Sequence, residues 1–351
     1  MKVVALVTVY YTENCGSVLQ AYALMKTIQK LGYQVVLIST KNSYSGHSLK
    51  RLIKNLLQTI VRKDFSDIFP IIKKYQQYHL WIKSLPQMTI KQAKHSAISA
   101  YVFGSDTIWD IRSKYFLASY DVFWGTAFPL EYKVAYGASV ANSSKKEILS
   151  LGYPRKALTD FQRISVRDGH SEQVVQSLSQ QRIERVCDPT FLLDKKEYRP
   201  FLKKVKEKNY MLVYLFDDLE QEQVRQILQF AKKNHLMLIS VGKKMSWCER
   251  HKESTLENFL SYYYQADYII SNTFHGTIFS LLFHKQFFIL DFQKKKVEEL
   301  LISLNLRQRL VSDLKNLDVL AKEKIDNQQL ETTFQKWKTE SLSYLKKSLQ
   351  S

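Results

Sequence analysis

A histidine at the start of a predicted helix is the residue of this sequence with the clearest chemistry. Residues 271–279 read Ser-Asn-Thr-Phe-His-Gly-Thr-Ile-Phe, and the short apolar run at 267–270 before them is typical of a buried parallel strand. Asn272 and Thr273 favour the position before a helix, so we expect the helix to begin there. Open α/β sheets bind ligands at the carboxyl ends of their strands, and this stretch therefore predicts a binding site.

His275 falls in the first turn of that predicted helix. An imidazole exchanges a proton near neutral pH, and the N–H groups at a helix start, here those around Thr273 and Thr277, attract anions. Gly276 would leave room for a ligand against the backbone. The stretch predicts anion binding together with proton transfer, and the alternative is a helix cap followed by a packed histidine.

A second polar turn follows the strand predicted at 3–9 and contains Asn14, Gly16 and Ser17. It ends at a helix predicted over 17–31, so it lies on the same kind of sheet edge as His275. The turn has neither the three-glycine fingerprint of dinucleotide-binding proteins nor the lysine of a P-loop, so neither cofactor class is supported. Cys15 within it is interpreted as a small loop residue because no base can be placed beside it.

Four further candidates come directly after short apolar runs. Ser105 and Asp106 either bind a substrate hydroxyl or cap a turn. Arg167 suits an anion because its planar fork binds carboxylate or phosphate through two hydrogen bonds, and the alternative is a surface pair with Asp168. Lys243 lies in another such loop, where a lysine is more often only solvated.

The order of these runs predicts an α/β protein with two Rossmann-like domains facing each other across a cleft. The N-terminal domain is expected at 1–190, with a basic helical insertion at about 41–95. A linker at 191–209 would precede the C-terminal domain at 210–327, and a C-terminal helix would follow at 328–351. A chain of 351 residues with 45% apolar residues is long enough to form two such cores.

The insertion contains a basic amphipathic helix, predicted over 49–63. Its apolar residues recur at helical spacing, and no acid interrupts its basic residues, which are Lys50, Arg51, Lys54, Arg62 and Lys63. Two interpretations stay open: a helix packed on its domain with a basic outer face, or a helix that lies on an anionic membrane surface. A second helix is expected at 68–82.

The charge balance of 52 Lys+Arg against 33 Asp+Glu, a formal net charge of +19, indicates anionic partners. Cys15, Cys187 and Cys248 are odd in number and far apart, so we expect no disulfide framework, no metal site and a reducing compartment. No apolar run reaches membrane-spanning length, and the apolar N-terminus is interpreted as a strand and not a signal peptide. A cytoplasmic protein is therefore expected.

Six motifs, in order along most of the chain, resemble the polysaccharide pyruvyl transferase family. They are Asn14-Cys15-Gly16-Ser17 with Leu19-Gln20-Ala21-Tyr22-Ala23-Leu24, Gly104-Ser105-Asp106-Thr107-Ile108-Trp109, Tyr136-Gly137-Ala138-Ser139, Ile164-Ser165-Val166-Arg167-Asp168, Asp188-Pro189-Thr190, and the stretch at 271–277. The chain departs from the family pattern where Asn272 replaces an acid, Asp168 a glutamate and Gly137 an alanine.

The resemblance implies a GT-B-like arrangement and transfer of a pyruvyl group from phosphoenolpyruvate to a sugar of a cell-wall or capsule polysaccharide, or of its lipid-linked precursor, with formation of a ketal and release of phosphate. His275 would transfer a proton, Arg167 would bind the donor, and the turns at 14–17 and 273–277 would supply N–H groups to phosphate. No cofactor is implied, since phosphoenolpyruvate is a substrate. The enzyme would be peripheral at the inner face of the cell membrane, where donor and acceptor meet.

Two other functions remain open. A nucleotide-sugar glycosyltransferase would share the architecture, although no acidic residue is clearly placed for a ribose. A non-catalytic basic module on a membrane is the second alternative. Nucleic acid is not expected as a partner, because the aromatic residues fall in core-like segments and form no stacking platform.

Overall fold

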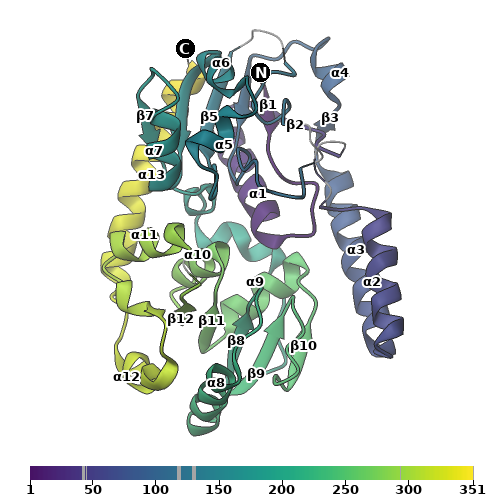
Figure 1. The fold of residues 1–351 in the computed structure, drawn as a ribbon, viewed down its shortest axis with the longest axis vertical. Coiled ribbons are helices and arrows are strands. Elements are labelled where there is room, and N and C mark those ends of the chain that lie inside the picture. The colour runs from purple at the N-terminus through teal and green to yellow at the C-terminus, as the bar shows by residue number, and fades with distance from the viewer. Residues whose placement is uncertain (42–43, 45, 117–119, 129–131, 293, 351) are drawn as a thin grey trace. The chain divides into compact units, whose positions relative to one another are not determined.

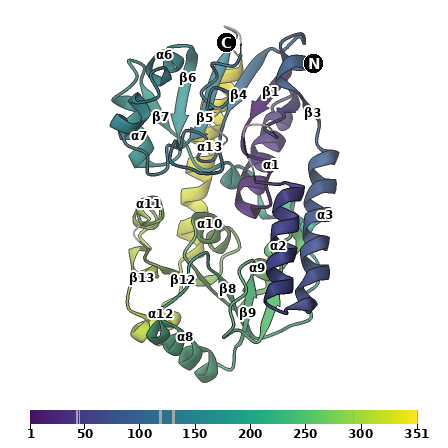
Figure 2. The same ribbon diagram turned by 45° about the vertical axis from the view of Figure 1, so that its right-hand side comes forward.

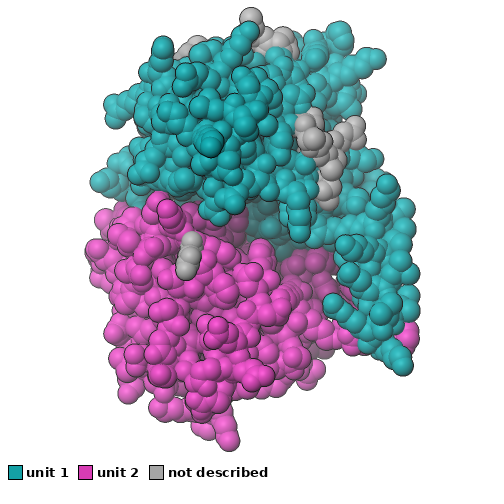
Figure 3. Space-filling view, in the orientation of Figure 1, with its two compact units in different colours: residues 1–63, 75–193, 335–351 teal, residues 64–74, 194–334 magenta. Residues whose placement is uncertain are grey.

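The structure is a computed structural model that describes residues 1–41, 44, 46–116, 120–128, 132–292 and 294–350. The chain divides into two compact units (Figure 3). Unit 1 comprises Met1–Lys63, Tyr75–Leu193 and Gln335–Ser351, and unit 2 comprises Asp64–Lys74 and Asp194–Phe334. None of the helices in the described part of the chain has the length and apolarity needed to cross a membrane.

Unit 1 is built on a parallel sheet of seven strands in the order β3-β2-β1-β4-β5-β6-β7 (Figure 1). The strands are β1 (Val3–Val7), β2 (Gln34–Ile38), β3 (Gln87–Met88), β4 (Ala100–Phe103), β5 (Lys133–Ala138), β6 (Phe161–Val166) and β7 (Ile183–Arg185). The chain winds outward in one direction from β1 and then in the other from β4. The sheet therefore has its topological switch point between these two strands, where open α/β sheets bind ligands.

Helices cover both faces of this sheet, because alternate residues of its strands point to opposite sides. The helices of this unit are α1 (Cys15–Lys30), α2 (Leu49–Val61), α4 (Ile90–Ala93), α5 (Lys145–Leu149), α6 (Pro154–Thr159) and α7 (Gly169–Gln176), with the later parts of α3 (Ile68–Ser84) and α13 (Asn327–Gln350), whose first residues belong to unit 2. Val4 and Leu6 of β1 pack in a core with α1 and α13, while Ala5 and Val7 face a second core. The last helix lies against β5 (Figure 2), where the Tyr344 hydroxyl donates to the Ala135 carbonyl at 2.8 Å.

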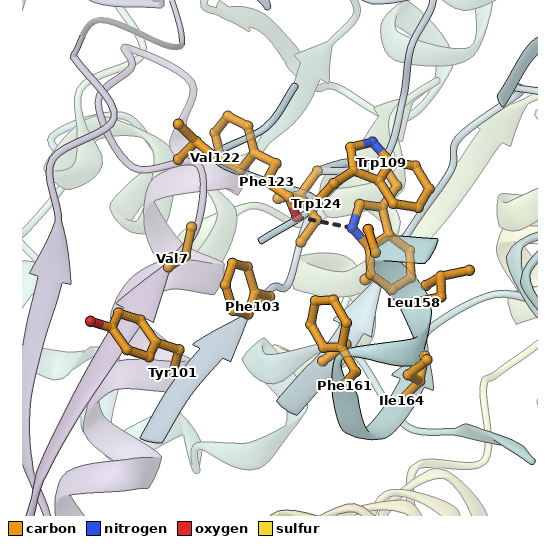
Figure 4. Close-up of a cluster of buried hydrophobic side chains, with 14 of the residues drawn as sticks. Val7, Tyr101, Phe103, Trp109, Val122, Phe123, Trp124, Leu158, Phe161 and Ile164 are labelled. Atoms are coloured by element: carbon orange, nitrogen blue, oxygen red, sulfur yellow. Dashed lines mark hydrogen bonds between the residues drawn. The ribbon is translucent and has the colours of Figure 1, made fainter. Parts of the chain in front are cut away.

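The second core of unit 1 is rich in aromatic side chains (Figure 4). The rings of Trp109 and Trp124 stack with centroids 5.0 Å apart, and both are fully buried. The Trp109 indole N–H donates to the Phe123 carbonyl at 3.0 Å, so its polar atom is satisfied inside the core. Trp109 directly follows the polar loop after β4, and its burial anchors that loop.

Unit 2 repeats the same winding in a parallel sheet of six strands, ordered β10-β9-β8-β11-β12-β13. The strands are β8 (Tyr210–Tyr214), β9 (Met237–Val241), β10 (Arg250–Lys252), β11 (Tyr268–Ser271), β12 (Gln286–Leu290) and β13 (Leu310–Val311). The helices are α8 (Gln221–Lys233), α9 (Leu256–Gln265), α10 (Phe274–Leu282), α11 (Lys295–Ser303) and α12 (Leu317–Lys322). Its switch point lies between β8 and β11, the strand that leads to His275.

The prediction of two Rossmann-like α/β domains and a C-terminal helix is confirmed. The short strand β13 follows β12 in the chain and pairs with it. The unit boundary falls at 193/194, inside the expected linker, and that linker contains a 3-10 helix over Lys195–Phe201. The final helix was expected as a separate element, but its residues from Gln335 onward belong to unit 1.

Candidate functional site

Most of the predicted site residues lie at the two switch points. In unit 1, Asn14 follows β1 and Asp106 follows β4, the two strands that flank the switch. In unit 2, Asn272 and Thr273 follow β11, and the loop after β8 lies beside them. Lys243 follows β9, which is the neighbour of β8. The strand order therefore gathers residues that are far apart in the sequence at one edge of each sheet.

Of the two residues expected before the helix that carries His275, Thr273 is the one that caps it. Thr273 is the N-cap of α10, and its hydroxyl accepts from the Gly276 N–H at 2.9 Å. Ser271 supports this cap, because its hydroxyl accepts from the Thr273 N–H at 3.2 Å and donates to the Tyr214 carbonyl at 2.8 Å. Thr277 is also fixed locally, with its hydroxyl donating to the Thr273 carbonyl at 2.9 Å. The turn that presents His275 is thus held by its own hydroxyl groups.

His275 is the second residue of α10, in the first turn as predicted. Its side chain is partly exposed, and its ring meets the Phe274 ring edge to face with centroids 5.6 Å apart. The ammonium of Lys296 lies over the Phe274 ring, 5.2 Å from the ring centroid. The imidazole therefore lies at the carboxyl edge of the unit 2 sheet, with its Nε2 atom buried.

Asn272 ties two loops of this edge together and does not cap the helix. Its side-chain oxygen accepts from the Phe216 N–H at 3.1 Å, and its amide donates to the Asp217 carboxylate at 2.8 Å. Asp217 was missed by the sequence analysis, although it lies in the loop after β8, and the rule used for the other loops would have selected it. The family pattern has an acid where this chain has Asn272, and here the carboxylate of Asp217 lies beside the Asn272 side-chain amide.

Gly276 has a different role from the one expected. A Cβ atom at this position would lie 2.2 Å from the Ser271 hydroxyl and 2.5 Å from the Thr273 hydroxyl. The space beside the backbone is filled by protein, so the prediction that Gly276 leaves room for a ligand is wrong. The glycine allows the first turn of α10 to pack on the end of β11.

We expect Gly276→Ala to destabilise unit 2 by about 1–3 kcal/mol, the usual range for overpacking of a filled site. The added methyl group would push on two hydroxyls that hold the helix cap, so it would also disturb the position of His275. Urea unfolding followed by circular dichroism measures the change. An unfolding midpoint equal to that of the parent would show that the Ser271 and Thr273 hydroxyls can move aside without loss of stability.

At the unit 1 switch point, Asn14 caps α1 with its side chain. Its Oδ1 atom accepts from the Gly16 N–H at 2.9 Å and the Ser17 N–H at 3.3 Å, so these two N–H groups of the turn expected to bind phosphate point to Asn14. The helix begins at Cys15 and not at Ser17. The Cys15 thiol is buried and shares a hydrogen bond with the Tyr78 hydroxyl at 2.8 Å, so the expected small loop residue is instead packed at the start of α1.

Arg167 lies at the centre of a buried ionic cluster. One terminal nitrogen donates to Asp188 Oδ2 at 2.6 Å, and the other donates to Asp106 Oδ1 at 3.2 Å. The first also donates to the Ser105 hydroxyl at 3.4 Å. The Arg167 side chain is 1% exposed. Burial alone would lower the pKa of Arg167, but the nearby carboxylates of Asp188 and Asp106 raise it above its ordinary value, so the guanidinium stays charged.

The alternative of a surface pair between Arg167 and Asp168 is wrong. Asp168 is the N-cap of α7 and accepts from the Ser171 N–H at 2.8 Å. The partner that the sequence analysis missed is Asp188, which also accepts from the Thr190 N–H and hydroxyl at 3.0 and 2.7 Å. Because the two terminal nitrogens of Arg167 bind protein carboxylates, the geometry favours a positioning role for this residue over direct contact with a donor.

Ser105 and Asp106 show the contacts of a self-supporting turn. The Ser105 hydroxyl is buried and donates to the Gly137 carbonyl at 3.0 Å, and Asp106 accepts from the Thr107 N–H at 2.8 Å. Of the two alternatives for these residues, the contacts favour the structural one. Lys243 differs from them, since its ammonium is partly exposed and pairs with Asp218 at 2.7 Å.

Solved structures similar to this chain share its two-domain architecture. A UDP-N-acetylglucosamine 2-epimerase structure has a TM-score of 0.56 at 7% identity, with 98% of this chain and 95% of that chain covered. The Methanocaldococcus jannaschii UDP-GlcNAc 2-epimerase structure has a TM-score of 0.51 at 10% identity, with 98% of this chain and 100% of that chain covered. The S. aureus MnaA–UDP structure has a TM-score of 0.50 at 9% identity, with 95% of each chain covered. These are GT-B-fold proteins, and at such identities the similarity establishes the GT-B-like fold alone.

No curated protein sequence gave a significant match. The family model described as polysaccharide pyruvyl transferase matches residues 14–293, a stretch that begins at the Asn14 cap and includes β4, β8, β11 and the His275 turn. The chain therefore belongs to the polysaccharide pyruvyl transferase family of enzymes.

Proposed function

We propose that this protein transfers a pyruvyl group from phosphoenolpyruvate to a sugar of a cell-surface polysaccharide, or of its lipid-linked precursor, as a cyclic ketal. The reaction needs a proton on the methylene carbon of the donor, so that the adjacent carbon accepts one sugar hydroxyl oxygen. A second hydroxyl oxygen then replaces phosphate at that carbon. Of the two hydroxyl protons, one balances the new methyl group and the other leaves with phosphate or solvent.

The observation that carries the proposal is the position of His275 in the first turn of α10, at the carboxyl edge of a sheet and inside the family match. A partly exposed imidazole there suits the proton transfer to or from the substrate. Phosphate and carboxylate need cationic or N–H donors, and the start of a helix favours such anions. We place no cofactor or metal in this mechanism.

A nucleotide-sugar glycosyltransferase is the second candidate, because solved structures with the same fold are named for UDP-sugar enzymes. The family match favours pyruvyl transfer. Parallel incubations separate the two: the protein with simple and lipid-linked galactosides plus phosphoenolpyruvate, and the same acceptors plus UDP-sugars. Phosphate release in the first and no UDP release in the second support the proposal, and the opposite pattern overturns it.

We further propose that the enzyme is cytoplasmic and works at the inner face of the membrane, with α2 on the lipid surface. Much of the apolar stripe of α2 is exposed: Leu49 is 59% exposed, Leu57 58% and Val61 81%, while Leu52 and Leu56 are half-buried. Thr59 is the only fully buried residue of this helix, which argues against the alternative of a helix whose whole apolar side is packed on its domain. Exposed basic residues flank the stripe, as in helices that lie on anionic lipid.

Replacing Lys50, Lys54 and Arg62 with glutamate should release the protein from anionic vesicles. Each basic residue near an anionic leaflet contributes on the order of 1 kcal/mol, so we expect affinity to fall by roughly 100-fold or more. Arg51 is kept because it donates to the Gly46 carbonyl. Vesicle co-sedimentation at low and high salt measures binding, and turnover of a soluble acceptor should not change.

The matched control reverses three exposed lysines on other helices of unit 1, Lys145, Lys146 and Lys156. This control protein should still bind the vesicles. An equal loss of vesicle binding in both triple variants would show that only the total charge of the protein matters. A parent protein that does not bind anionic vesicles at low salt would contradict the membrane proposal.

A further inference from the structure

The carboxyl edge of the unit 2 sheet carries a cation that the sequence analysis did not consider. The ammonium of Lys294 donates to the Asn272 carbonyl at 2.7 Å and lies 3.5 Å from the Asp217 carboxylate. Asp217 in turn accepts from the Asn272 side-chain amide at 2.8 Å. Three loops, which follow the adjacent strands β8, β11 and β12, contribute one residue each to this cluster.

The cluster holds the Lys294 ammonium in one place. The Phe216 N–H donates to Asn272 Oδ1 at 3.1 Å, which turns the Asn272 amide nitrogen toward Asp217. The carboxylate then faces the lysine, with 3.5 Å between its oxygen and the ammonium nitrogen. The Asn272 carbonyl to which the lysine donates belongs to the residue just before the N-cap of α10, so the cation stands close to the turn that carries His275.

The same ammonium remains accessible. The side chain of Lys294 is 34% exposed, whereas that of Arg167 is 1% exposed and bound to two carboxylates. An ammonium has three donors, and the Asn272 carbonyl takes one of them. Lys294 can therefore bind an anion without breaking the contacts that hold it, and the partial positive charge of the nearby helix start favours the same ligand.

We infer that Lys294, positioned by Asp217 and Asn272, binds an oxyanion of the substrate. If the proposed function holds, on which this assignment of the ligand rests, the oxyanion is the phosphate or the carboxylate of phosphoenolpyruvate. Lys294 then takes the anion-binding role that the sequence analysis gave to Arg167, and Asp217 is a positioning residue.

The test compares Lys294→Met with Lys295→Met, which removes the same charge from an exposed neighbour at the start of α11. Lys294→Met should raise the KM for phosphoenolpyruvate by roughly tenfold or more, the scale of one lost charge-assisted hydrogen bond. Its kcat should change much less, while Lys295→Met should leave both constants near those of the parent. Asp217→Asn should raise the KM less than Lys294→Met does, since the lysine keeps its bond to the Asn272 carbonyl.

A second readout does not depend on turnover: the thermal stabilisation of the protein by inorganic phosphate and, separately, by pyruvate. Stabilisation by phosphate that is lost in Lys294→Met and kept in Lys295→Met assigns the site to the phosphate group, and the same pattern with pyruvate assigns it to the carboxylate. If the two variants match in KM and in both stabilisation assays, the inference is overturned. A parent that binds phosphate through Lys294 but does not turn over phosphoenolpyruvate would instead refute the proposed function.

Discussion

Replacing His275 with alanine is expected to lower turnover by roughly 100-fold or more, the usual scale for a lost acid–base group. The imidazole is partly exposed and contacts the Phe274 ring, so its removal opens no large cavity and the fold should remain intact. Initial rates of phosphate release measure turnover, and thermal unfolding checks the fold. The proton transfer should be the step that fails, so the KM for phosphoenolpyruvate should change less than kcat.

The matched control is His95→Ala, which removes an exposed histidine of unit 1 and should leave the rate unchanged. Near-normal turnover in a folded His275→Ala protein would remove His275 from the mechanism.

Replacing Arg167 with methionine should destabilise the protein by about 3–5 kcal/mol, because two buried carboxylates would lose their cation. The pairs involved are short, and the Asp188 side chain is itself 1% exposed. Arg167→Lys keeps the charge but has no planar fork that reaches both acids, so we expect an intermediate loss. Chemical denaturation followed by fluorescence measures the free energy of unfolding.

Arg163→Met is the control for this series. Arg163 pairs with Glu184 at 3.4 Å, and both side chains are more than a third exposed, so its loss should change stability by less than about 1 kcal/mol. An Arg167→Lys protein that is as stable as the parent but has lost affinity for phosphoenolpyruvate would contradict the positioning role and restore direct donor binding by Arg167.

The sequence predicted those parts of the fold whose signal is local. The apolar run at 267–270 is long enough to identify the buried strand β11, and the helix predicted over 17–31 is found as α1. The strands β3, β10 and β13 were missed because they have two or three residues each, and the Arg250-His251-Lys252 sequence of β10 carries no apolar pattern. Their position is fixed by pairing with neighbours and not by propensity.

The site was predicted less completely than the fold, because its contacts join distant residues. Asp106 and Asp188 lie 61 and 21 positions from Arg167, and no local pattern reveals that they would bind it. Asn14 and Thr273 are favoured at helix starts because their side chains accept hydrogen bonds from the first N–H groups of the helix. A sequence signal for such a cap therefore does not predict that these N–H groups are available to bind phosphate. Likewise, the amphipathic pattern of α2 is the same whether its apolar side is packed or exposed.

The most direct test of the central proposal is the product of a single incubation with phosphoenolpyruvate and an acceptor glycan. We expect the released phosphate to equal the pyruvate attached to the glycan, with the pyruvate seen by mass spectrometry and NMR as a ketal that bridges two hydroxyls of one sugar. His275→Ala should abolish both signals in parallel. Phosphate release without attached pyruvate, or no consumption of phosphoenolpyruvate with any galactoside or lipid-linked acceptor, would contradict the account.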